Sequence, residues 1–236
     1  MNPLLEGIIG YKIVTTSSLP THTSSGLEYL YAGNGIFARA IRPGIEVLMP
    51  ICLCSQTIKG LPHLTPYLKV TPLIPKPLLL EMWRSSYQAG NQFHEILFHL
   101  HNTDAGWDLQ VPEQIQTPTS CQPTHSGSDS SHQKAAVDIH SHGSLPAFFS
   151  TTDNADESGF RIYGVLGRVN TLKPEIKLRV GLFRHCWDVP ARAVFDIDPD
   201  FFMLDVSLSY GCKFYSTDVP PVNLKEFLNF LIMRFL

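Results

Sequence analysis

The segment from residue 138 to residue 153 reads DIHSHGSLPAFFSTTD and brings together two histidines, a serine and an aspartate. Residues 135–142 have the apolar character of a strand, on which successive side chains alternate between the two faces. His140 and His142 are two residues apart, so both imidazoles project to the same face of the expected strand. The segment therefore predicts a pair of converging histidines.

This histidine pair indicates a metal site. Neutral imidazole is the commonest protein ligand of zinc, and a catalytic zinc keeps three protein ligands and one open position. The turn through Pro146 returns the chain to an expected helix start, where Asp153 is a suitable third ligand. A zinc ion would lower the pKa of its bound water toward roughly 7 and polarise a substrate carbonyl, and a general base would take the proton of the water.

Composition places the 236-residue chain among folded globular proteins of one or two domains, with 44% hydrophobic and 17% charged residues. Lys and Arg number 18 against 21 acidic residues, so no basic surplus is present and nucleic acid is not an expected partner. We find no apolar run of the roughly 20 residues needed for a membrane span and no secretory signal, and we expect a cytoplasmic protein. The five cysteines are scattered and are expected to be reduced.

The N-terminal part has β character. Residues 27–54 contain short β-type runs separated by Gly-Asn-Gly at 33–35 and Pro-Gly at 43–44, which predicts a small antiparallel β module. Repeated prolines between residues 55 and 77 indicate a connector or an edge-strand region. We therefore expect an N-terminal β-rich module over residues 1–76.

A new pattern begins at residue 77. Apolar residues recur at helical spacing over 77–90, which predicts an amphipathic helix. Runs at 93–100 and 107–112 predict a β-hairpin, and the Ser, Thr, Gln, Gly and Pro of residues 114–133 predict a mobile loop. The later pattern predicts an α+β fold with a mixed sheet flanked by helices, and its elements are a strand at 135–142, a short helix at 150–159, strands at 160–169, 175–184 and 186–195, and a C-terminal helix within 216–236.

The spacing His-x-His, seven residues, Ser, two residues, Asp resembles the signature of the JAMM zinc metalloprotease family, also called MPN-plus or JAB-type. The resemblance implies that His140, His142 and Asp153 hold zinc and that Ser150 stabilises an oxyanion. Family members carry an upstream glutamate as general base, and Glu95 occupies that place. The resemblance also implies an α/β/α layered core, similar to that of cytidine deaminases, over residues 77–215.

A narrower resemblance covers roughly residues 27–200. The segments 32–40, 44–50, 111–114 and 148–167 look like those of the PRTRC system protein A group of prokaryotic JAB-domain proteins. This group implies a bacterial, plasmid-type cassette that also encodes a ubiquitin-like protein and a ThiF-like protein. The flexible C-terminal tail of the ubiquitin-like partner would then enter the zinc groove as an extended strand.

Some of these residues have alternative interpretations. Ser150 and Asp153 also fit a capping box at a helix start, and this role is compatible with catalysis. Glu81 and Glu113 are alternatives to Glu95 as the general base. Glu81 falls within the expected helix and Glu113 follows a proline at a strand end, so Glu95 is favoured.

A second histidine pair, His99 and His101, lacks partners at the matching spacing, because Leu109 and Pro112 stand where the serine and aspartate would be. We interpret this pair as structural or supporting histidines. The Cys-Leu-Cys run at 52–54 has no second cysteine pair, and we interpret it as part of a buried strand and not as a metal or redox site.

These features together predict a zinc-dependent hydrolase that cleaves a peptide or isopeptide bond at the C-terminus of a ubiquitin-like protein. An amidase acting on a sulfur-carrier protein would share this chemistry and differ only in the leaving group. The alternative is a zinc-binding adaptor of the same cassette, with hydrolysis suppressed by the 114–133 loop.

Overall fold

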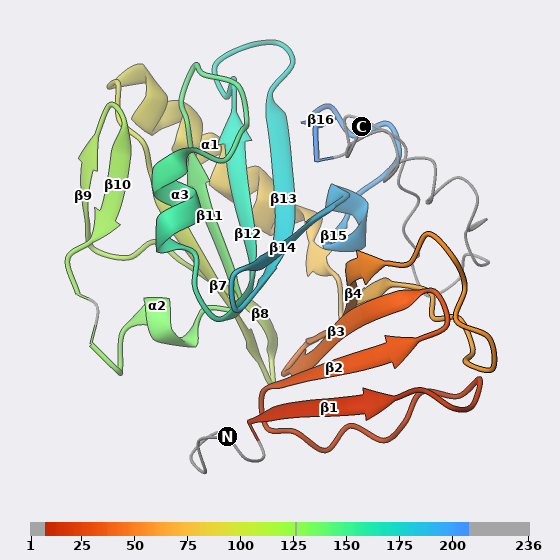
Figure 1. Ribbon diagram of the computed structural model, residues 1–236. Coiled ribbons are helices and arrows are strands. Elements are labelled where there is room, and N and C mark those ends of the chain that lie inside the picture. Colours follow the sequence, from red (N-terminus) through yellow and green to blue (C-terminus); the bar gives the residue numbers. More distant parts are fainter. Residues whose placement is uncertain (1–7, 126, 208–236) are drawn as a thin grey trace. The chain divides into compact units, whose positions relative to one another are not determined.

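The computed structural model describes residues 8–125 and 127–207 (Figure 1). The described residues divide into two compact units, the first ending at Thr71 and the second beginning at Pro72. The C-terminal helix expected within residues 216–236 lies outside the described residues. Among the described residues, every helix is too short or too polar to cross a bilayer.

The first unit contains a five-stranded sheet in which the strands follow one another in chain order. β1 pairs with β2 in parallel and all other neighbours are antiparallel, so the antiparallel module expected at 27–54 is confirmed. Its core contains Leu30, Phe37 and Leu48. The strands are β1 (Ile9–Ile13), β2 (Leu27–Ala32), β3 (Gly35–Arg42), β4 (Ile45–Leu53) and β5 (Tyr67–Val70).

A buried ion pair lies in the middle of this sheet. Glu28 on β2 is fully buried and accepts a hydrogen bond from Arg39 Nε on β3 at 3.0 Å. Lys12 Nζ on β1 lies 2.9 Å from the same carboxylate. Although burial raises the pKa of Glu28, the Thr23 amide and the two cations outweigh it and lower that pKa to about 2.

The second unit is built around a mixed seven-stranded sheet with the order β14-β13-β12-β11-β7-β8, in which β16 pairs with β13. β11 and β12 are parallel, whereas β11 and β7 are antiparallel. The elements are β6 (Ile74–Pro75), α1 (Lys76–Asn91), β7 (Leu97–Thr103), β8 (Gly106–Gln110), β9 (Gln114–Thr117), β10 (Ser120–Pro123), α2 (Ser131–Lys134), β11 (Val137–Ser141), α3 (Thr151–Asp156), β12 (Phe160–Gly167), β13 (Glu175–Leu182), β14 (His185–Val189), the 3-10 turn η2 (Ala191–Ala193), β15 (Phe195–Asp196) and β16 (Leu204–Asp205).

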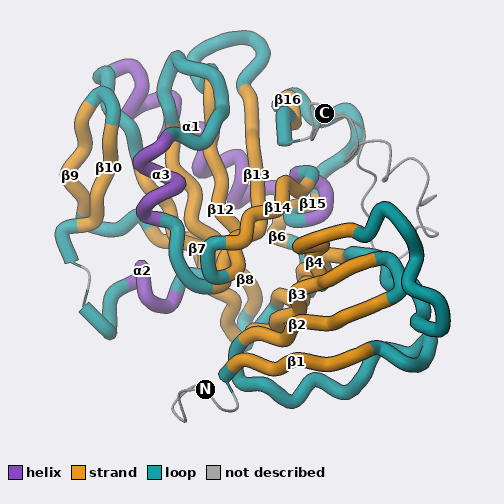
Figure 2. Tube along the Cα trace, in the orientation of Figure 1, coloured by secondary structure: helices purple, strands orange, loops and turns teal. Residues whose placement is uncertain are grey.

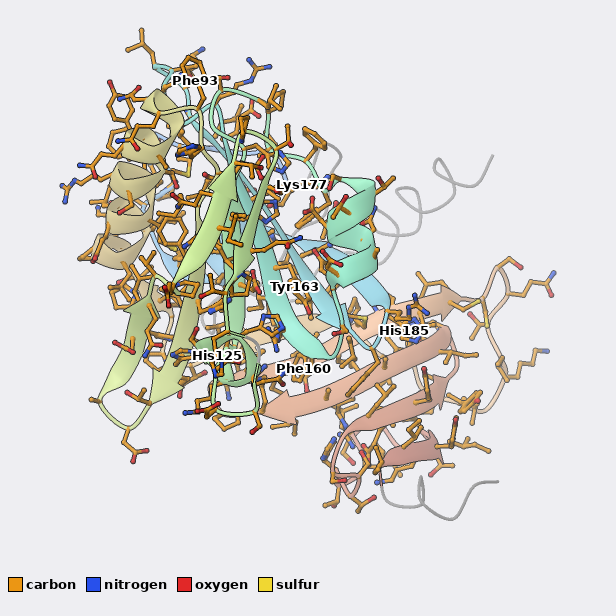
Figure 3. The ribbon with its side chains drawn as sticks, turned by 90° about the vertical axis from the view of Figure 1, so that its left-hand side faces the viewer. Phe93, His125, Phe160, Tyr163, Lys177 and His185 are labelled. Atoms are coloured by element: carbon orange, nitrogen blue, oxygen red, sulfur yellow. The ribbon has the colours of Figure 1, made fainter. Side chains whose placement is uncertain are left out.

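Strands outnumber helices along the second unit and often follow one another directly, which makes the fold a strand-rich α+β fold (Figure 2). The α1 and α3 helices lie on opposite faces of the central sheet (Figure 3). The helix expected at 77–90 is confirmed as α1, which begins with Pro77 in its first turn and buries Leu79 and Met82. The hairpin expected after it is confirmed as β7 and β8, with Thr103 opposite Gly106.

Three expected boundaries are corrected. β7 begins at Leu97 and not at residue 93, because α1 runs to Asn91 and Phe93 then adopts a φ of 59°, outside the strand region. The strand expected at 186–195 ends at Val189, since Pro190 has no amide hydrogen for the ladder. The helix expected at 150–159 is the six-residue α3.

The mobile loop expected at 114–133 is also corrected, because it contains the antiparallel pair β9 and β10 and the short α2. The Gln114 side chain bonds both the amide and the carbonyl of Leu97, at 2.8 and 3.0 Å. The Thr117 hydroxyl bonds that of Ser120 across the turn at 2.8 Å. Polar side chains thus satisfy backbone groups and give this segment regular structure without an apolar core.

Candidate metal centre

β11 carries the first histidine of the candidate site. Val137, Ile139 and Ser141 are fully buried on one face of the strand, whereas Asp138 and His140 project to the other. The strand lies inside the sheet between β7 and β12, so its backbone is held on both sides. This alternation fixes the face on which Asp138 and His140 emerge.

His142 directly follows β11 and is held from two directions. Its amide donates to the Leu166 carbonyl at 2.8 Å. Its ring packs edge-on against Phe148, with 4.7 Å between the ring centroids. The Nε2 atoms of His140 and His142 lie 3.0 Å apart, so the convergence expected from their spacing is present.

The connection from β11 to α3 depends on a glycine. A Cβ atom at Gly167 on β12 would lie 2.1 Å from the Ala147 nitrogen, a distance that no real side chain tolerates. The Arg168 amide donates to the Leu145 carbonyl at 2.7 Å and holds the same loop against the strand. Gly167 therefore allows the close approach that returns the chain toward the two histidines.

Ser150 caps α3 and Asp153 completes the capping box. The Asp153 amide donates to Ser150 Oγ at 3.1 Å, and the Ser150 amide donates to Asp153 Oδ2 at 2.6 Å. Asp153 Oδ1 lies 3.4 Å from His140 Nε2, and Asp153 Oδ2 lies 4.0 Å from His142 Nε2. The structure thus brings the three expected ligands together, with one donor atom from each within 4.8 Å of the others.

These separations suit a metal ion. Ligands at about 2.0–2.1 Å from a tetrahedral ion are about 3.4 Å apart. The three distances of 3.0, 3.4 and 4.0 Å between donor atoms bracket that value. We call His140, His142 and Asp153 the primary cluster, whose donors could hold a metal ion.

The protonation states of the histidines favour the same conclusion. Burial lowers the pKa of His140, and the Asp153 carboxylate opposes this effect only in part. Burial and the neighbouring His140 lower the pKa of His142 to about 4. Both imidazoles are therefore neutral near pH 7 and retain a lone pair for a cation.

Glu95 lies between α1 and β7, with its amide donating to the Thr117 carbonyl at 2.9 Å. The carboxylate is buried, and burial together with Asp153 raises its pKa to about 7. A carboxyl with this pKa exchanges a proton near neutral pH. Glu95 and the three residues of the primary cluster line one open cavity of about 540 Å³, together with Ser150 and the residues of β10.

The alternative bases are placed elsewhere. Glu81 on α1 and Glu113 before β9 are both exposed, and neither belongs to the described residues that line the cavity. Cys121 on β10 does line it. Burial, with the carboxylates of Glu95 and two aspartates, raises the pKa of the Cys121 thiol, so this group is no thiolate nucleophile at neutral pH.

The remaining sequence interpretations have mixed outcomes. His101 has a structural role, because its Nε2–H donates to the Ser131 carbonyl at 2.9 Å. His99 instead approaches His132 and Asp138, a grouping that the sequence analysis missed. Cys52 and Leu53 belong to β4, so the strand expected there is confirmed, but the expected burial is wrong because Cys52 is exposed and Cys54 is only partly buried.

No protein-family model and no curated protein matches the chain. Among solved structures, the chain is similar to the solution structure of protein DSY2949 from Desulfitobacterium hafniense, with 15% sequence identity and a TM-score of 0.33. The similarity covers 49% of this chain and 88% of that chain.

Proposed function

We propose that the protein is a zinc-dependent hydrolase of the JAMM type that cleaves a peptide or isopeptide bond at the C-terminus of a ubiquitin-like or sulfur-carrier protein. The observation that carries the proposal is the primary cluster beside Glu95 in one open cavity. The position of α1 and α3 on opposite faces of a mixed sheet supports a layered JAMM-type core (Figure 3).

The donor set supports zinc as the metal. Two neutral imidazoles and one carboxylate match the three-ligand sets of catalytic zinc sites, which keep a further position open. When bound, zinc would lower the pKa of a water molecule and polarise the scissile carbonyl. His140, His142 and Asp153 would hold the ion with no large movement, since their donor atoms already converge.

Glu95 would act as the general base and then as the general acid. Its pKa of about 7 lets it accept a proton from water and return that proton to the departing amine. Its burial also keeps bulk water from competing for the carboxylate. Positioned acid–base groups of this kind contribute about 10²- to 10⁴-fold to a rate.

Ser150 would stabilise the developing oxyanion. Its Oγ accepts a hydrogen bond from the Asp153 amide, which leaves its own hydroxyl hydrogen for the carbonyl oxygen of a substrate. Ser150 also lines the cavity, so its hydroxyl reaches the same space as the primary cluster. One fixed donor of this kind is worth about 10²- to 10³-fold in rate.

The cavity favours an extended polypeptide as substrate. Residues 119–123, which include all of β10, form one wall of the cavity and offer backbone groups to a chain laid beside them. The C-terminal tail of a ubiquitin-like protein is such a chain. From the sequence resemblance we propose that the protein belongs to a PRTRC-type cassette, with a ThiF-like protein as a further partner.

Cleavage of ubiquitin-like fusion proteins tests this proposal. The zinc-loaded protein is incubated with a fusion that extends the C-terminus of the ubiquitin-like partner, and the products are identified by mass spectrometry. Glu95→Gln is expected to lower the rate by about 10²- to 10⁴-fold while zinc remains bound. His140→Ala is expected to remove the zinc of the primary cluster and activity together, whereas the matched variant Glu113→Gln, at an exposed site, retains both.

An adaptor gives a different result. The zinc-loaded protein would then bind the ubiquitin-like partner without cleaving it, and Glu95→Gln would change neither zinc content nor partner binding. Full hydrolytic activity of the metal-free protein would exclude the proposed mechanism.

A further inference from the structure

A second group of metal-ligand side chains lies on the same sheet as the primary cluster. His99 comes from β7, His132 from α2 and Asp138 from β11, and one donor atom of each lies within 4.8 Å of the others. We call these three residues the His99 cluster. It shares no residue with the primary cluster, although His132 and Asp138 line the same cavity.

His99 is the best-defined member of the His99 cluster. Its side chain is 0% exposed, and its Nδ1 bonds Ser131 Oγ at 2.8 Å. Its Nε2 is buried and has no hydrogen-bond partner in the described part of the chain. A buried polar atom without a hydrogen-bond partner destabilises the folded state, and a ligand bound to this nitrogen would remove that cost.

The Nε2 atom of His99 faces a carboxylate. It lies 3.7 Å from Asp138 Oδ2, which is too far for a hydrogen bond. Burial lowers the pKa of His99 to about 4, so the ring is neutral near pH 7. If Nδ1 donates its hydrogen to Ser131, Nε2 presents a lone pair to an acidic oxygen, and a cation between the two acceptors would satisfy both.

The geometry fits such a cation. His132 Nδ1 also lies 3.7 Å from Asp138 Oδ2, the same separation as that of His99 Nε2. Both distances exceed a hydrogen bond and approach the separation of about 3.4 Å between ligands of a tetrahedral ion. Small side-chain adjustments would bring all three donors onto one ion.

The guanidinium group of Arg161 already contacts two residues of the His99 cluster. Arg161 Nη1 lies 3.1 Å from His132 Nδ1 and 3.7 Å from Asp138 Oδ2. An ion bound by the His99 cluster would have to displace the contact with His132 and would stand close to the guanidinium charge. We therefore expect weaker binding here than at the primary cluster, where no such positive group is within salt-bridge distance of Asp153 in the described residues.

We propose that His99, His132 and Asp138 form a second divalent-cation site, with two nitrogens and one oxygen that suit zinc or cobalt. The ion ties α2 to β7 and β11 and so fixes one wall of the cavity. It shares no ligand with the primary cluster and has a structural role. This inference stands apart from the proposed hydrolase activity, because it requires neither Glu95 nor a substrate.

Cobalt titration of the metal-free full-length protein tests the second site, with visible absorption and metal analysis as readouts. The wild type is expected to bind two ions, the second more weakly. His132→Gln removes one ligand at a half-exposed position and is expected to lose the weaker ion only. The matched control His125→Gln alters an exposed histidine that pairs with Asp129 outside the cluster, and it is expected to keep both ions.

His142→Gln separates this proposal from the proposed function. It is expected to lose the tighter ion and retain the weaker one. Loss of an ion in His142→Gln with an unchanged count in His132→Gln would overturn the second site and leave the hydrolase proposal standing. Loss of an ion in His132→Gln with an unchanged count in His142→Gln would support the second site. It would also remove the metal on which the hydrolase proposal depends.

Hydrogen exchange gives an independent readout of the structural role. Metal is expected to slow exchange of the amides of residues 131–136 in the wild type and in His142→Gln, but not in His132→Gln. Equal protection in all three proteins would contradict the link between α2 and the sheet.

Discussion

Ser150 and Asp153 are joined by two reciprocal hydrogen bonds, of 3.1 Å to the serine hydroxyl and 2.6 Å to the aspartate carboxylate. The carboxylate that approaches His140 is thereby held by the start of α3. Ser150 also lines the cavity. The capping box and the proposed catalytic groups are thus one structural unit, and substitutions can separate the two roles.

Substitution of Ser150 separates capping from catalysis. Ser150→Ala is expected to destabilise the protein by about 1 kcal/mol through loss of the cap and to lower the hydrolysis rate by about 10²- to 10³-fold. Ser150→Gly keeps an N-cap residue that costs only a few tenths of a kcal/mol and has no side-chain donor, so its stability should approach that of the wild type while its rate stays low. Thermal unfolding and single-turnover cleavage provide the measurements. A normal rate in Ser150→Gly would contradict the oxyanion role.

Proton release on metal binding reports on Glu95. In the metal-free protein the pKa of Glu95 is about 7, because of burial and the Asp153 charge. A dication at the primary cluster favours the ionised carboxylate, so zinc binding at pH 7 should release about half a proton from Glu95. The two histidines add little, since their lowered pKa values leave them neutral.

Calorimetry in buffers of different ionisation enthalpy measures this release. The titration uses the His132→Gln background, in which only the primary cluster is expected to bind metal. Metal affinity should rise with pH between about 6 and 8 in this background and lose most of that dependence when Glu95→Gln is added. The same pH dependence with and without Glu95 would place the titrating proton on another group.

The strand that carries His140 could be predicted because its signal is local. Side chains of residues 137–141 alternate strictly between a buried face and the cavity, and a period of two is visible without any tertiary information. Asp138 lies on the same face of the strand, two residues before His140. The same alternation therefore predicts that Asp138 also faces the cavity.

The His99 cluster could not be predicted in the same way. His99 and His132 lie on separate elements, and their approach depends on α2 packing beside β7. The polar composition of residues 114–133 gave no apolar pattern from which β9, β10 or α2 could be placed. These elements are held by hydrogen bonds between side chains and backbone, such as those of Gln114 with Leu97, which leave no periodicity in a sequence.

Gly167 supplies a test of how the loop positions Asp153. Gly167→Ala would place a Cβ 2.1 Å from the Ala147 nitrogen and push the 146–147 segment away from β12. We expect a loss of about 1–3 kcal/mol in stability and weaker zinc binding at the primary cluster. Gly90→Ala on α1 is the matched control, because its Cβ would meet Val169 at an ordinary 3.4 Å. Equal zinc affinity in the two variants would show that the close approach does not position Asp153.

The buried Glu28 gives the first unit a pH-dependent stability. Its folded-state pKa of about 2 lies below the ordinary value of 4.5, so its contribution is complete above about pH 4.5 and is lost as the pH falls toward 2. A shift of this size corresponds to about 3 kcal/mol. Glu28→Gln leaves Arg39 buried without its partner and should destabilise the unit by about 3–5 kcal/mol at pH 7.

Hydrogen exchange of the β2 and β3 amides at several pH values measures this contribution, since it reports on the first unit alone. The difference in protection between the wild type and Glu28→Gln is expected to be largest at pH 5–7 and to shrink as the pH falls below about 4, because the wild-type carboxylate then becomes protonated as well. Glu113→Gln, an exposed substitution in the second unit, controls for the general effect of removing a carboxylate. A difference that stays constant down to pH 2 would show that the charge of Glu28 does not stabilise this sheet.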